Sequence, residues 1–236
     1  RCSSLNGCTA GAVTVTAAPE VIAGEPLTVT VRAEYLFGQP VAGAKVAIRL
    51  YETAGRYDYG YGEDWEPSGD YWIGGYEPVA TGVTDANGEV SFTTTSEKRT
   101  YWNYDIDPWR VAIEATVDDG SAQTVSAMAT STVYQAAEVV RLDTGGYWVN
   151  ANEPFAIEAK VISNVGQPQP VAGRTVEVTL RQWDRSVWEY SHVVQTDEWT
   201  SGPDGVLATS YRVPRPGYYR LRLTGTDDAG RQLFVE

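Results

Sequence analysis

The chain contains nearly the same segment twice. QPVAGAKVAIRL occupies residues 39–50, and QPVAGRTVEVTL occupies residues 169–180. Further segments recur in the same order: 25–35 with 153–163, 84–92 with 200–211, and 109–120 with 219–230. A catalytic motif has no evident need to be duplicated, whereas a folding unit that occurs twice repeats its strand and turn residues. The repetition therefore predicts two copies of one domain.

Apolar and polar residues alternate in the repeated segments. The residues expected on one apolar face are Leu27, Val29, Val31, Ala33 and Tyr35 in one strand, Ala44, Val46, Ile48 and Leu50 in the next, and Trp109, Val111, Ile113, Ala115 and Val117 in a third. A period of two with one apolar face indicates half-buried strands of packed antiparallel sheets. No stretch of helical period is long enough to cover a sheet. We predict an all-β chain of two tandem antiparallel β-sandwich domains of immunoglobulin or fibronectin-III type.

The length of 236 residues suits two domains of this kind. Each copy of about 115 residues is large enough to bury most of its unfolded surface and fold alone. We expect an N-terminal tail at 1–10, a first domain at 11–134 and a second domain at 135–236. The first domain is the longer one because a loop at 55–78 interrupts it.

The net charge of −13 argues against partners that are themselves polyanions. Nucleic acid and anionic membranes are bound through an excess of basic residues that neutralise phosphate. This chain has the opposite balance, with 18 basic and 31 acidic residues. No apolar run approaches the roughly 18 residues of a membrane span. Both cysteines, Cys2 and Cys8, lie in the tail. A small disulfide loop between them is possible and suits an oxidising compartment, which indicates an extracellular or cell-envelope location.

Residues for catalysis or metal binding are sparse. His192 is the one histidine, and the polar stretch EYSHVVQ around it contains no nucleophile motif. One histidine and two tail cysteines do not make a zinc site. Acidic residues number 31, so nothing in the sequence selects a catalytic pair among them. We expect no enzyme, no cofactor and no metal.

Aromatic residues are concentrated at 55–78, among glycines and acids. The candidate interaction residues there are Tyr57, Tyr59, Tyr61, Trp65, Tyr71 and Trp72. Such a loop can be a contact surface or a platform for sugar rings. The alternative is a long hairpin whose rings pack on one another and on the side of the domain. A second aromatic cluster lies at 101–109, and the segment RQWDRSVWEY at 181–190 is a shorter counterpart in the second copy.

Residues 33–48, AEYLFGQPVAGAKVAI, resemble a signature of the third macroglobulin domain of alpha-2-macroglobulins and complement proteins. That signature is Tyr-x-Phe-Gly-x-Pro-Val-x-Gly-Ala, and its matches are Tyr35, Phe37, Gly38, Pro40, Val41, Gly43 and Ala44. VTDANGEVSF at 83–92 resembles the strand opening that follows in that family. The second copy, with PGYYRLRLTGTDDAGR at 216–231 near its end, is similar to the fourth macroglobulin domain of bacterial members.

The resemblance implies an architecture rather than a reaction. In that family, seven-stranded fibronectin-like domains build a ring around a bait segment, and a protease that cuts the bait triggers closure. The chain contains no Cys-Gly-Glu-Gln thioester motif, and the matched residues are structural. The resemblance implies a scaffold segment whose partners are the neighbouring macroglobulin domains and, through the parent protein, proteases. The alternatives are an adhesion or glycan-binding module that uses loop 55–78, and an accessory module of a secreted polysaccharide-degrading enzyme.

Overall fold

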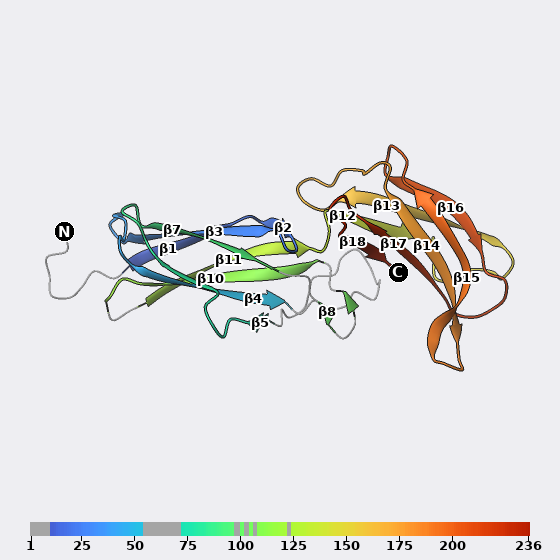
Figure 1. The fold of residues 1–236 in the computed structure, drawn as a ribbon, viewed down its shortest axis with the longest axis horizontal. Helices are drawn as coiled ribbons and strands as arrows, with labels where there is room; N and C mark the ends of the chain where they lie inside the picture. The colour runs from blue at the N-terminus through green and yellow to red at the C-terminus, as the bar shows by residue number, and fades with distance from the viewer. Residues whose placement is uncertain (1–9, 54–71, 97–99, 102–103, 106–107, 122–123) are drawn as a thin grey trace. The chain divides into compact units, whose positions relative to one another are not determined.

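The computed structural model describes residues 10–53, 72–96, 100–101, 104–105, 108–121 and 124–236. The chain divides into two compact units, Arg1–Tyr134 and Gln135–Glu236. Within the described residues every regular element is a β-strand (Figure 1), and no helix there is long and apolar enough to cross a membrane. This confirms the predicted all-β class.

The first unit contains two main sheets. Its strands are β1 (Ala10–Ala17), β2 (Glu20–Ile22), β3 (Pro26–Tyr35), β4 (Lys45–Thr53), β5 (Trp72–Gly74), β6 (Ala80–Val83), β7 (Glu89–Thr95), β8 (Thr100–Tyr101), β9 (Tyr104–Asp105), β10 (Trp109–Asp118) and β11 (Thr124–Tyr134). One sheet has the order β1-β3-β7, and the other has the order β2-β11-β10-β4-β5, with β6 also paired to β4. β8 and β9 pair with each other. The pairs are antiparallel except that β2 runs parallel to β11, which the sequence did not predict.

The second unit has a simpler seven-stranded plan. Its strands are β12 (Glu138–Asp143), β13 (Pro154–Ser163), β14 (Thr175–Asp184), β15 (Glu189–Thr200), β16 (Val206–Arg212), β17 (Tyr219–Thr226) and β18 (Gln232–Val235). They form one sheet of order β12-β13-β16 and one of order β15-β14-β17-β18, with every pair antiparallel. Three strands against four is the arrangement of fibronectin-like sandwiches.

Each unit has its own apolar core, built from the predicted alternating residues. In the first unit Leu27, Val29, Val31, Ala33, Ala44, Val46, Ile48, Trp109, Val111, Ile113, Ala115 and Val117 are buried, whereas Tyr35 and Leu50 are only partly buried. In the second unit the core includes Ile157, Ala159, Val161, Val176, Val178, Leu180 and Leu223. Side chains on the other faces of the same strands are mostly exposed or only partly buried. The period of two therefore identified the buried faces correctly.

The residues of the macroglobulin-like signature form the corner between β3 and β4. Gly38 and Gly43 have φ angles of 80° and 77°, a region that glycine enters without steric cost. Pro40 makes an isolated bridge with Glu34, and Val41 donates from its amide to the carbonyl of Ala33. These residues turn the chain from one sheet to the other and perform no chemistry.

The corner between β13 and β14 makes the same contacts. Val171 donates from its amide to the carbonyl of Val161, and Pro170 makes an isolated bridge with Ile162. Gly166 and Gly173 have φ angles of 80° and 72°. The recurring letters thus correspond to recurring hydrogen bonds at equivalent positions of the two units.

Candidate interaction site

Most of the predicted interaction residues lie outside the described part of the chain. Tyr57, Tyr59, Tyr61, Trp65 and Tyr71 belong to this group, as do Cys2 and Cys8 of the expected disulfide. The backbone of Trp72 begins β5, where it pairs with Thr53 of β4. The proposed aromatic contact surface at 55–78 therefore stays a prediction.

The second aromatic segment, 181–190, lies within the described residues. It forms the end of β14, a hairpin and the start of β15, and Figure 1 shows this orange hairpin projecting from the body of the second unit. Asp184 accepts hydrogen bonds from the amide and hydroxyl of Ser186, which closes the turn. These bonds hold the pKa of Asp184 below its usual range. The turn is therefore ordered by its own side chains.

Three rings meet beside this turn. Trp183 contacts Trp188 edge-on at a centroid distance of 6.3 Å, and it contacts Tyr190 edge-on at 5.0 Å. Edge-to-face pairs at these distances are favourable. Trp188 is nevertheless 76% exposed, and its φ angle of 56° is rare for a bulky residue. The aromatic residues were evident from the sequence, but the strained backbone of Trp188 was not.

An arginine covers the far side of the ring cluster. The guanidinium of Arg220 lies 4.3 Å from the ring centre of Tyr190, within cation–π distance. Arg220 also makes an ion pair of 2.9 Å with Glu236, which is bound by Arg222 as well. Arg220 alternates along β17 with the core residue Leu221, so its side chain belongs to the outer face of the sheet.

Arg181 completes this surface. It lies directly opposite Arg220 in the β14–β17 pair, so the two side chains share the outer face. Among the described residues Arg181 has no hydrogen bond or ion pair from its side chain, and its Nε atom is buried without an acceptor. We call Arg181, Trp183, Trp188, Tyr190 and Arg220 the aromatic–arginine face. Its combination of rings and guanidinium groups is suited to binding and not to covalent catalysis.

Further exposed rings lie at the same end of the second unit. Trp148 is 93% exposed and follows Tyr147 in the connection between β12 and β13. Tyr218, in the connection between β16 and β17, is also exposed, and its carbonyl accepts a hydrogen bond from the amide of Trp183. In an antiparallel sandwich these connections and the β14–β15 hairpin meet at one end. This end is therefore rich in exposed aromatic surface.

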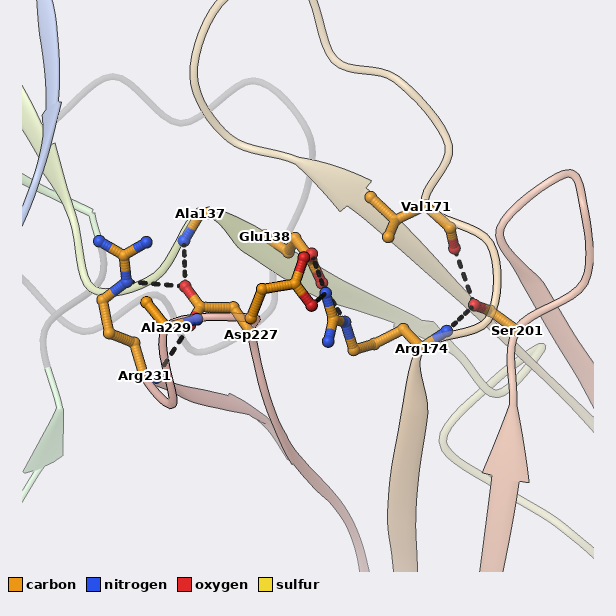
Figure 2. A network of polar contacts seen from close by, with 9 residues as sticks. Ala137, Glu138, Val171, Arg174, Ser201, Asp227, Ala229 and Arg231 are labelled. Carbon is orange, nitrogen blue, oxygen red and sulfur yellow. Dashed lines mark hydrogen bonds and ion pairs between the residues drawn. The ribbon is translucent and has the colours of Figure 1, made fainter.

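The opposite end of the second unit is polar and tightly bonded (Figure 2). Arg174 binds Glu138 with both Nε and a terminal nitrogen, at 2.6 and 2.5 Å, and also contacts Asp228 at 2.9 Å. The Arg174 and Glu138 side chains are largely buried, with 15% and 9% of their surface exposed. The two-point geometry fixes the first residue of β12 against the start of β14.

Asp227 closes the same end. Its carboxylate accepts hydrogen bonds from the amides of Ala137, Ala229 and Arg231 and from the guanidinium of Arg231 (Figure 2). Burial alone would raise the pKa of Asp227, but these hydrogen bonds outweigh burial and lower the pKa. The network anchors the connection that follows β11, so its role is structural.

Among the described residues, no group of three His, Cys, Asp or Glu side chains gathers in a way that could hold a metal ion. His192 lies exposed in β15, where it pairs across the strands with Gln182.

Comparison with known proteins gives matches in structure alone. No protein-family model matches the chain, and no curated protein matches it. Trypsin-activated alpha-2-macroglobulin of Escherichia coli matches with a TM-score of 0.56 and 15% identity, over 95% of this chain and 16% of that one. Because the match covers 95% of this chain, it includes both units. The chain has a fold found in bacterial alpha-2-macroglobulins.

Two further structures of bacterial alpha-2-macroglobulins agree. The native E. coli protein matches at a TM-score of 0.50 and 14% identity, over 94% of this chain and 16% of that chain. The Salmonella protein reacted with methylamine matches at a TM-score of 0.50 and 16% identity, over 95% of this chain and 16% of that chain. The chain therefore spans about a sixth of the length of these alpha-2-macroglobulins. The likeness confirms, at the level of the fold, the resemblance that residues 33–48 indicated.

Proposed function

We propose that the chain is a non-catalytic scaffold segment of a bacterial alpha-2-macroglobulin-like protein, whose complete form traps endopeptidases. The observation that carries this proposal is the match in fold over 95% of the chain to only 16% of the E. coli protein. A match of this extent is what a pair of domains inside a larger assembly produces. The first unit then corresponds to a third macroglobulin domain and the second unit to a fourth.

The contacts of the signature residues support the proposal. Gly38, Pro40 and Gly43 act in the corner between β3 and β4, and Gly166, Pro170 and Gly173 act in the equivalent corner of the second unit. These are structural roles, as the resemblance implies. We infer that the two units are tandem copies of one domain, 11–134 and 135–236, after a tail at 1–10.

Partners and location follow from the same proposal. The direct partners are neighbouring macroglobulin domains of the same parent chain, and proteases are bound by the parent as a whole. Such a protein acts outside the cell or in the cell envelope, where it meets foreign proteases. No enzymatic activity belongs to the segment itself.

The test is made on the native protein. Antibodies raised against this chain are used to blot an extract of the source organism, before and after brief treatment with a broad-specificity protease. A parent several times larger than 236 residues, cut at one interior site by limited digestion, supports the trap. A native species no larger than this chain overturns it, and it favours a separate adhesive or glycan-binding module.

A further inference from the structure

We propose that the aromatic–arginine face of the second unit binds an acidic glycan. A pyranose ring stacks on Trp188, and the carboxylate of the sugar binds Arg181. The proposal concerns the outer face of the sheet β15-β14-β17-β18 and does not depend on the protease-trap function.

The first argument is the exposed ring of Trp188. A backbone at φ 56° is strained for a residue with a Cβ, and glycine or asparagine would fit this turn better. The hairpin nevertheless keeps a tryptophan there, held edge-on against Trp183 and 76% exposed. Strain at an exposed aromatic residue points to binding. Because the neighbouring ring restricts Trp188, a ligand that stacks on it loses little additional entropy.

The second argument is the uncompensated charge. Arg181 and Arg220 lie directly opposite each other, an arrangement that repels. Glu236 binds Arg220 and Arg222, but among the described residues no acid binds Arg181. The face is thus locally positive within a chain of net charge −13. The buried Nε of Arg181 has no acceptor among the described residues, so its charge is not offset from within the protein. A ligand carboxylate binds the terminal nitrogens of the same guanidinium, because arginine holds carboxylates through charge-assisted hydrogen bonds.

The third argument concerns the class of ligand. An oligosaccharide of uronic acids carries apolar ring faces and carboxylates on rigid units, so one unit can stack on Trp188 while the carboxylate of the same or a neighbouring unit binds Arg181. An acidic peptide has to place two flexible side chains to make the same contacts, which costs more entropy. A membrane surface is disfavoured because Asp184 and Glu189 bound the hairpin on both sides, and anionic lipids repel such acids.

The experiment measures binding of tetragalacturonate to the full chain by isothermal titration calorimetry, with neutral maltotetraose as the comparison ligand. The variants are Arg181→Gln and Trp188→Gly. The matched controls are Arg141→Gln, an exposed arginine of β12 with the same change in charge, and Trp148→Ala, an exposed tryptophan outside the face. Circular dichroism verifies that each variant is folded.

We expect tetragalacturonate to bind and maltotetraose to bind at least tenfold more weakly. Each of the two face variants should weaken tetragalacturonate binding at least tenfold, whereas the controls should change it less than twofold. Raising the salt concentration should weaken binding of the acidic ligand.

Several results would overturn the proposal. One is that no tetragalacturonate binds at millimolar concentration, and another is that maltotetraose binds equally well. Hexaglutamate binding with the same loss in both variants would assign the face to an acidic peptide. Capture of the chain by vesicles of phosphatidylcholine and phosphatidylglycerol, lost in Trp188→Gly, would assign it to a membrane.

Discussion

The hydroxyl of Thr84 donates a hydrogen bond to the carbonyl of Val41 over 2.6 Å, across the corner between β3 and β4. The same oxygen accepts from the amide of Ala44 at 2.9 Å. Ser201 repeats both contacts in the second unit, where its hydroxyl donates to Val171 at 2.7 Å and accepts from Arg174 at 2.9 Å. One buried hydroxyl therefore closes the corner in each unit.

This geometry predicts that Thr84→Val destabilises the first unit by about 1–3 kcal/mol. Valine has the same shape but leaves the buried amide of Ala44 without an acceptor, and an unsatisfied buried group costs about that much. Urea unfolding of the full chain and hydrogen exchange at the Ala44 amide measure the effect. Thr84→Ser keeps the hydroxyl and serves as the control, which should lose less than half as much. Equal stability of Thr84→Val and wild type would show that the hydroxyl does not hold the corner.

Gly88 and Gly205 occupy equivalent positions, each packed against the corner of its own unit. Their φ angles are 76° and 74°, and a Cβ at either position would lie 2.5 or 2.6 Å from a backbone carbonyl oxygen, that of Ala33 or Val161. Gly24 has a similar φ of 77° but open space around it. Gly24→Ala should therefore cost about 1–2 kcal/mol, the strain of the backbone alone. Gly88→Ala and Gly205→Ala should cost clearly more because the backbone has to move.

Thermal unfolding of the three alanine variants under identical conditions tests this difference. The comparison is informative because all three substitutions enter the same region of backbone conformation. If Gly88→Ala and Gly24→Ala were equally stable, the close approach to Ala33 would have no energetic weight.

The strands and cores were predictable because their signal is local. Alternation in residues 27–33 and 109–117 specifies which side chains are buried, and the structure buries them. Glycine and proline in the corners were equally clear, since their backbone preferences act within a few residues. The roles of Thr84 and Ser201 were not recognised, because a hydroxyl in a turn gives no sign of being buried.

The aromatic–arginine face was predictable only in part. The rings of Trp183, Trp188 and Tyr190 lie within one short segment, so the sequence alone shows that this segment is rich in aromatic residues. Arg220 joins them from β17, which requires the register of strands that are distant in sequence. Local pattern gives no information on register between separate strands, so the charge beside the rings became visible only in the folded chain.

The ion pair between Arg174 and Glu138 predicts that loss of either side chain strongly destabilises the second unit. Removing one member leaves a buried charge, so Arg174→Met should destabilise the second unit by about 3–5 kcal/mol. The double variant Arg174→Met with Glu138→Leu should recover much of this loss, because an apolar pair removes the buried charge. Urea unfolding of the two single variants, the double variant and wild type completes the cycle. Simple addition of the two single effects would show that the pair is not coupled.

The lowered pKa of Asp227 predicts that the second unit loses stability in acid. Because its pKa is lowered in the folded state, the unfolded state binds the proton more tightly. The stabilisation is therefore complete above the ordinary carboxyl pKa of 3.8 and is lost as the pH falls through the lower folded value. At pH 7, Asp227→Asn should lose about 1–3 kcal/mol, since the ion pair with Arg231 disappears in a buried site. Urea unfolding between pH 7 and pH 2 should show the variant and wild type converging in acid.

Asp228→Asn is the matched control for this titration, because it makes the same change in charge one residue further along the chain. The Asp228 side chain is 94% exposed, so water screens its contact with Arg174. Its stability curve should run parallel to that of wild type over the whole range. A difference between Asp227→Asn and wild type that stays constant down to pH 2 would contradict the assignment, because the effect would then come from packing and not from the charge of Asp227.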